Sequence, residues 1–152
     1  MADQETASVE IQTDGAPIDA WEFNYFLYLF IATYVAASQR VLESGLSVHS
    51  PEQEFYRVAE TIKPELTGID GLGMAQLARK DLPYNLTIVD IRRENPLEIV
   101  FGGIAVALAL AVIISGGEFK GPGFKAKLPP LGAGIERLRS AFGRKALPKR
   151  RQ

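Results

Sequence analysis

Side chains that could do chemistry are few in this 152-residue chain. The sequence has no cysteine and one histidine, His49, which excludes disulfides, zinc–thiolate sites, iron–sulfur clusters, thiol nucleophiles and multi-histidine metal sites. Ser115 stands in a Ser-Gly-Gly sequence with no neighbouring base that could activate its hydroxyl. The sequence therefore predicts no metal site, no cofactor and no catalytic residue.

The remaining polar motifs have structural explanations. Glu52, Glu54 and Glu60 fall in the first turns and on the outer side of an expected helix, where acidic side chains favour the helix dipole. The glycines of residues 68–73 have neither the dinucleotide nor the phosphate-loop spacing, so they indicate a turn before a short helix. We therefore expect a protein that is not an enzyme.

Charge is distributed unevenly along the chain. The 17 basic and 18 acidic side chains give a net charge of −1. Residues 1–98, however, carry 7 basic and 16 acidic side chains, whereas residues 99–152 carry 10 and 2. This asymmetry favours a membrane surface as the partner of the basic part. Nucleic acid is disfavoured, because no aromatic residues interleave the basic tail.

The longest uncharged run is IVFGGIAVALALAVIISGG, at residues 99–117. As one helix it would be about 28 Å long, close to the roughly 30 Å hydrocarbon core of a bilayer. Glu98 and Glu118 flank it, where ionisable groups can stay in headgroup water. We therefore predict a hydrophobic helix over residues 97–117 that spans the membrane. A buried core helix and a re-entrant or interfacial segment are the alternatives.

Small residues recur every four positions in this segment, at Gly103, Ala107 and Ala111. In a membrane helix such a ridge lets another helix pack closely. We expect it to be the membrane-helix packing site, either in a homo-oligomer or with a partner membrane protein.

Residues 7–95 are predicted to form an acidic α+β module, after a disordered N-terminus at residues 1–6. Alternating residues 8–13 predict a short strand, and the β-branched run at 86–92 predicts another, with Thr87, Val89 and Ile91 on one side. The uncharged run at residues 23–39 fits a buried core helix or a second membrane span.

A surface helix is predicted within that module. Ser50 and Gln53 match a capping box, and Pro51 suits the first helical turn. Phe55, Val58, Ala59 and Ile62 then follow at helical spacing, up to Pro64, where we expect the helix to end.

The basic end divides into a module at residues 118–146 and a tail at residues 147–152. Two short strands surround a Gly-Pro-Gly turn at residues 121–123, and an amphipathic helix follows Pro129-Pro130. Basic side chains near an anionic leaflet each contribute about 1 kcal/mol of attraction. We expect contact with anionic headgroups through Lys120, Lys125, Lys127, Arg137, Arg144 and Lys145.

Together these patterns predict an α+β protein. It has a small helix-rich N-terminal module with short strands, one central hydrophobic transmembrane helix, and a C-terminal β-hairpin plus amphipathic basic helix. We expect a small membrane-anchored, non-enzymatic interaction or adaptor protein of the cytoplasmic membrane, which self-associates through its apolar helix. The basic tail slightly favours a cytoplasmic C-terminus, although the charges close to the apolar segment are balanced.

Two alternatives remain open. One is a soluble, cytoplasmic α+β binding module or assembly subunit that buries the hydrophobic helix. The other is a membrane-perturbing effector.

Overall fold

The structure is a computed structural model that describes residues 5–11, 18–67, 86–93, 97–120 and 125–143. The described elements mix helices with one sheet, so the α+β class is confirmed. In chain order they are β1 (Glu5–Ile11), α1 (Ala20–Ser44), α2 (Glu52–Leu66), β2 (Thr87–Arg93), β3 (Leu97–Gly103), α4 (Ala105–Ile114), β4 (Glu118–Lys120), β5 (Lys125–Leu128) and α5 (Leu131–Phe142).

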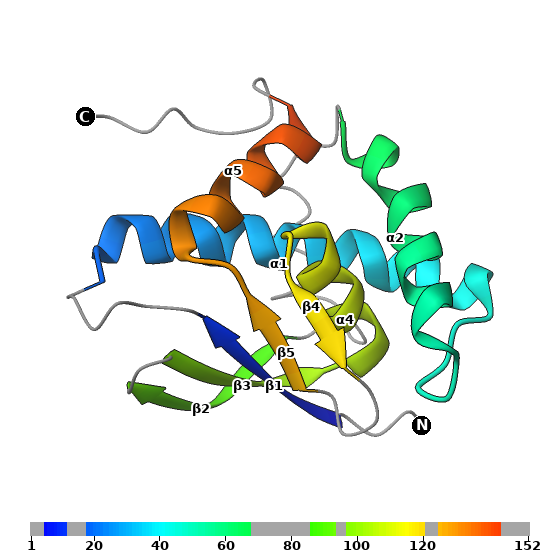
Figure 1. Cartoon of the computed structure of the whole chain (residues 1–152), viewed down its shortest axis with the longest axis horizontal. Coiled ribbons are helices and arrows are strands. Elements are labelled where there is room, and N and C mark those ends of the chain that lie inside the picture. The colour runs from blue at the N-terminus through cyan, green and yellow to red at the C-terminus, as the bar shows by residue number, and fades with distance from the viewer. Residues whose placement is uncertain (1–4, 12–17, 68–85, 94–96, 121–124, 144–152) are drawn as a thin grey trace.

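The five strands form one sheet in the order β2-β3-β1-β5-β4 (Figure 1). β3 is antiparallel to both β1 and β2, and β4 is antiparallel to β5. β1 and β5 are parallel, with Val9 aligned to Ala126 on one side and to Ile99 on the other. The sheet thus joins strands from the acidic and basic parts of the chain.

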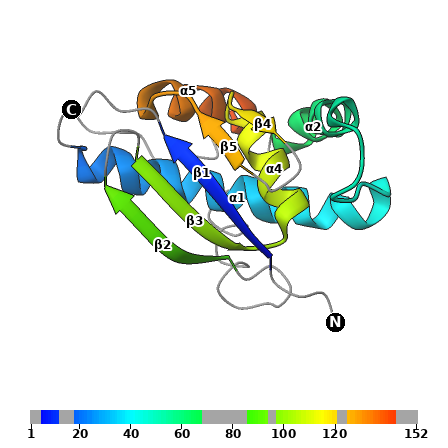
Figure 2. The ribbon, with the colours of Figure 1, turned by 60° about the horizontal axis from the view of Figure 1, so that its bottom comes forward.

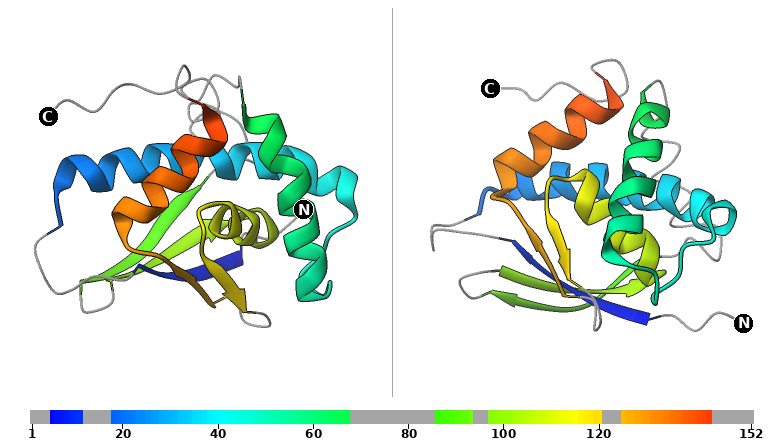
Figure 3. Two further views of the ribbon diagram at one scale, coloured as in Figure 1. Left: turned by 45° about the horizontal axis from the view of Figure 1, so that its top comes forward. Right: turned by 45° about the vertical axis from the view of Figure 1, so that its right-hand side comes forward.

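The described helices cover one face of this sheet, as Figures 2 and 3 show from three directions. Val9, Ile99 and Phe101 are buried on that face. The rings of Phe30 in α1 and Phe101 in β3 stack with their centroids 5.4 Å apart, which ties the longest helix to the sheet. α4 is packed against α1, α2 and the strands, and all of its residues are buried.

The predicted membrane span over residues 97–117 is wrong. Residues 97–103 form the inner strand β3, in which Leu97, Ile99 and Phe101 are buried while Glu98 and Val100 are partly exposed. α4 follows with 10 residues, about 15 Å of helix, which is half the thickness of a hydrocarbon core. Among the described residues, no helix combines the length and apolar character that a bilayer crossing requires.

Two glycines end the apolar segment. Gly116 adopts a left-handed backbone with φ of 89°. At Gly117, an added Cβ would lie 2.4 Å from the carbonyl oxygen of Lys127 and 2.8 Å from Cγ1 of Val112. The turn from α4 to β4 therefore runs so close to β5 that it has no space for a side chain.

The helix predicted around residues 23–39 is α1, which is longer than the uncharged run. Asp19 caps its start by accepting a hydrogen bond from the backbone N–H of Trp21 at 3.1 Å. Gly45 ends it in the left-handed conformation, with φ of 72°. Most of its central residues are buried beneath α4 and α5, as expected for a core helix.

The surface helix forms, but both of its predicted ends are wrong. The Ser50 hydroxyl accepts a hydrogen bond from the N–H of Ser47 instead of capping α2, which begins at Glu52 without a side-chain cap. At the other end Pro64 lies inside the helix, which continues to Leu66. The predicted inward stripe, including Phe55 and Ile62, is buried.

The other predicted elements that fall on described residues are the N-terminal strand, the hairpin and the C-terminal helix, and all three are present. β1 already begins at Glu5, so residues 5 and 6 of the predicted disordered N-terminus are strand. The hairpin is β4 and β5, and the basic amphipathic helix is α5, with Ile135, Leu138 and Phe142 buried. The short helix expected after the glycines of residues 68–73 lies outside the described residues.

Candidate functional site

β2 is an edge strand with an unusual surface. Its sequence, TIVDIRR, is rich in β-branched residues, which suit an extended backbone. Ile88, Val89 and Ile91 are 45%, 59% and 47% exposed, and they account for three of the five large hydrophobic side chains exposed in the described chain. β3 pairs with one side of β2, and no described strand pairs with the other side (Figure 2). We call that unpaired side the β2 edge.

A bulge decides which way the β2 side chains point. Ile88 is aligned with Phe101, but Asp90, two residues later, is aligned with the adjacent Val100, so Val89 is the additional residue. Ile91 is aligned with the buried Ile99. Ile88 and Ile91 therefore share the helix-covered face, although both side chains stay about half exposed there. The prediction that Thr87, Val89 and Ile91 lie on one side of the strand is wrong.

The opposite face of the sheet, which no described helix covers, carries a row of charged residues. The strand registers align Arg92, Glu98, Glu10, Lys127 and Glu118 across β2, β3, β1, β5 and β4. We call this set the charged row. Because residues aligned across neighbouring strands share a face, the charged row crosses the whole sheet.

Hydrogen bonds and ion pairs hold the β2 end of the charged row. The Ser8 hydroxyl donates to Oε2 of Glu98 at 2.8 Å, and Nε of Arg92 lies 3.8 Å from Oε1 of the same carboxylate. Arg92 also lies 3.4 Å from Oδ2 of Asp90 on its own strand. Arg92 and Asp90 are more than half exposed, so these pairs leave both side chains accessible to a partner.

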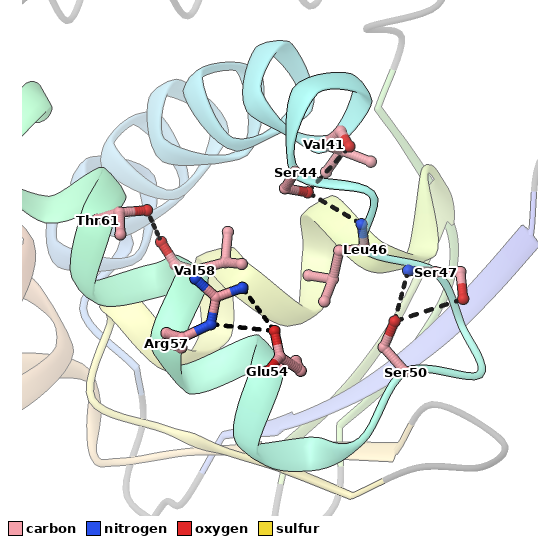
Figure 4. Close-up of polar contacts among 9 residues, drawn as sticks. All are labelled: Val41, Ser44, Leu46, Ser47, Ser50, Glu54, Arg57, Val58 and Thr61. Carbon is pink, nitrogen blue, oxygen red and sulfur yellow. Dashed lines mark hydrogen bonds and ion pairs between the residues drawn. The ribbon is translucent and has the colours of Figure 1, made fainter.

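A polar hollow of about 380 Å³ lies between α1 and α2. Its lining residues are Arg40, Glu43, Ser44, Arg57, Val58, Thr61 and Glu65. Figure 4 shows that Arg57 pairs with Glu54, while Ser44 and Thr61 donate to the backbone carbonyls of Val41 and Val58.

The charged groups of this hollow already bind one another. Arg40 pairs with both Glu43 and Glu65. The hydrogen bond from Arg57 lowers the pKa of the Glu54 carboxyl and raises that of the guanidinium, which keeps both charged. The arrangement is an exposed ion-pair network and supplies neither a nucleophile with a base nor a poised acid.

Among the described residues, the most buried titratable group with a perturbed pKa is a tyrosine with a structural role. Tyr34 is fully buried, and burial raises the pKa of its phenol. Its hydroxyl oxygen accepts a hydrogen bond from the backbone N–H of Ile104 at 2.9 Å, at the junction of β3 and α4. No group of three or more potential metal ligands gathers among the described residues.

The structure separates the predicted helix-packing residues. Ala107 and Ala111 lie in α4 and are fully buried inside the protein. Gly103 is the last residue of β3, so the three residues do not form one ridge on a helix. An added Cβ at Gly103 would lie 2.7 Å from the Tyr34 hydroxyl, which explains why glycine stands at this position.

This contact predicts energetic coupling between Gly103 and Tyr34. Tyr34→Phe should cost about 1–3 kcal/mol, because the Ile104 N–H loses its acceptor. Gly103→Ala should cost about 1–3 kcal/mol through overpacking. The double variant should lose less than the sum, because without the hydroxyl the nearest Tyr34 atom lies 3.3 Å from the new Cβ. Urea unfolding of the four proteins measures the coupling, and strict additivity would contradict it.

Of the predicted headgroup-contact residues in the described part of the chain, three lie on the β4–β5 hairpin and one lies on α5. The hairpin register aligns Lys120 with Lys125, and Lys127 with Glu118. Lys127 is exposed on β5 and Arg137 on α5. The other two residues of the predicted set, Arg144 and Lys145, lie outside the described residues.

Sequence reasoning found β2 as a strand but missed its role as an edge, and it missed the charged row. The available signal was the alternation of acidic and basic residues with apolar ones at Asp90, Ile91 and Arg92, followed by Glu98 inside an otherwise apolar run. Comparison with known proteins gives no further guide, because no protein-family model, curated protein or solved structure matches this chain.

Proposed function

We propose that this protein is a non-enzymatic interaction module that binds an extended segment of a partner protein by adding it as a strand at the β2 edge. The observation that carries the proposal is the half-exposed apolar set Ile88, Val89 and Ile91 on a seven-residue edge strand. An edge strand offers backbone N–H and C=O groups to a further strand, and side chains of a strand partner confer specificity.

The opposite edge of the sheet makes a useful comparison. β4 has three residues, and its central Phe119 is buried. Natural sheets blunt their edges with very short strands and with charged side chains. β4 fits that protective pattern. β2 also has charged side chains and a bulge, but it is longer and exposes three β-branched side chains. This contrast supports β2 as the binding edge.

Titration with a neutral strand-forming peptide tests the proposal. A heptapeptide of alternating valine and threonine, added to the ¹⁵N-labelled full-length chain, should shift the amide resonances of β2 more than those of β4. The same peptide with proline at its centre should bind more weakly, because proline removes a backbone donor. Resonances of β2 that stay unmoved at a protein concentration where the chain is monomeric would show the proposal to be wrong.

A lysine substitution provides the control on the protein. Ile91→Lys should abolish the shifts, because a charge at a strand edge disfavours further pairing. Glu118→Lys, which places the same side chain on exposed β4, should leave them unchanged. Equal effects of both variants would also contradict the proposal.

Attachment to an anionic surface, the function expected from the basic end, has less support. Lys127 and Arg137 are exposed, but Lys127 is aligned with Glu10 on one side and with Glu118 on the other. Acidic neighbours reduce the local positive potential. The membrane helix on which that expectation depended is β3 and the buried α4.

A further inference from the structure

We infer that the strand added at the β2 edge is β2 of a second copy of this chain, in an antiparallel pair centred on Ile91. This inference rests on the proposed function and specifies its partner. It follows from the register of the β2 side chains, which makes the strand complementary to itself in one alignment and self-repelling in its neighbours.

Symmetry restricts the choice of alignment. In an antiparallel pair, directly opposed residues project from the same face of the sheet. A two-fold axis perpendicular to the sheet keeps the helix-covered faces of both copies on the same side. A residue of β2 must then lie opposite its own counterpart at the centre of the pair. The regular part of β2 beyond the bulge at Val89 runs from Asp90 to Arg93. Arg93 is the last residue of the strand and has no β2 residue beyond it to pair, so Asp90, Ile91 and Arg92 remain as possible centres.

Charge selects among these three. Centring on Asp90 places two carboxylates opposite each other, and centring on Arg92 does the same with two guanidinium groups. Centring on Ile91 places Asp90 of each copy opposite Arg92 of the other. Opposite charges aligned across strands stabilise a pair, whereas like charges destabilise it. The Ile91-centred alignment therefore gains two ion pairs where its neighbours have repulsion.

The apolar side chains agree with the same alignment. Ile91 is 47% exposed and lies on the helix-covered face, beyond the cover of its own helices. In the Ile91-centred pair its side chain packs directly on the same side chain of the second copy. Association removes β-branched surface from water at the centre of the contact. The two sheets become one continuous sheet, with β4 at both of its ends.

Sedimentation velocity of the full-length chain over a concentration series tests the inference. The unmodified chain should form a dimer. Asp90→Arg and Arg92→Asp should each raise the dimer dissociation constant about tenfold or more, because two attractive pairs become repulsive. Glu52→Arg, at an exposed position of α2 outside the sheet, should leave it unchanged.

Mixing the two charge variants distinguishes ion pairs between two copies of the chain from ion pairs within one copy. A chain carrying Asp90→Arg has two basic residues at these positions, and a chain carrying Arg92→Asp has two acidic ones. At a concentration at which each variant alone is monomeric, an equimolar mixture should form a heterodimer. Coincident urea unfolding curves for the unmodified and Asp90→Arg chains, recorded at low concentration, show that this variant is folded.

The inference and the proposed function fail differently. A monomeric unmodified chain, or variants that do not recover dimerisation on mixing, would overturn the second copy as the partner. If the valine–threonine peptide still binds β2 in that case, the edge is a binding site for another protein. If neither the peptide nor a second copy binds there, both proposals are wrong.

Discussion

A chain that lacks residues 99–117 should show no cooperative unfolding transition and no near-ultraviolet circular dichroism of packed aromatic rings. The deletion removes most of β3, which pairs with β1 on one side and β2 on the other, and all of α4. Without β3 the edge strand has no neighbour, and without α4 the buried surfaces of α1 and α2 lose the helix between them. The loss affects the whole protein and not one module.

The membrane-anchored hypothesis expects the opposite outcome, since an acidic module at residues 7–95 would keep its own core. Replacing residues 99–117 with a glycine–serine segment of equal length is the matched control. It should be as unfolded as the deletion, because the missing contacts and not the shortened connection cause the loss. A truncated chain with a sharp urea transition would contradict the structure described here.

Replacing Ile99 by alanine should lower the free energy of unfolding by about 2–5 kcal/mol, whereas the same change at Ile91 should cost about 1 kcal/mol or less. The two isoleucines are aligned on adjacent strands and share a face. Ile99 is fully buried, whereas Ile91 is 47% exposed. The first substitution leaves a cavity in the core, and the second shortens a side chain already in contact with water.

Urea unfolding at low protein concentration measures both changes, so that association at the β2 edge does not contribute. This pair of variants compares burial while residue type and sheet face stay the same. Equal losses would mean that β2 is covered as well as β3 is, which would also contradict the proposed binding edge.

Local signals in the sequence predicted elements that depend on local chemistry. The alternation of residues 8–13 predicted part of β1, and the β-branched run at residues 86–92 predicted β2. Ser50 shows the limit of such signals. Its hydroxyl was expected to accept a hydrogen bond from the first turn of α2, but it accepts one from the loop N–H of Ser47 instead. Pro64 is tolerated inside the last turns of α2, which the sequence rule does not anticipate.

The apolar run at residues 99–117 was misread for a physical reason. From Ile99 onward, β3 and the fully buried α4 follow each other in one uncharged run, and periodicity alone does not separate a short apolar strand from a buried helix. Gly102 and Gly103, which end β3, look the same as the small residues of a membrane helix. The contact with Tyr34, distant in sequence, is what requires glycine at position 103.

The candidate site depends on alignments between distant segments, which no local pattern contains. β2 could be predicted as a strand from its β-branched residues, but its place at the edge follows from the order of all five strands. Glu98 was interpreted as a residue at the headgroup boundary, yet it lies between Arg92 and Glu10 in the charged row. A single sequence does not specify that register.

The parallel pairing of β1 with β5 also determines when the protein can fold during its synthesis. β1 leaves the ribosome long before its partner residues 125–128 are made. One side of β1 therefore stays open until β5 emerges, and contacts so far apart in sequence form slowly. An open strand is exposed to wrong pairing with other nascent chains. The fold consequently gives this protein a vulnerable period before β5 emerges, during which a chaperone that shields β1 would raise its yield.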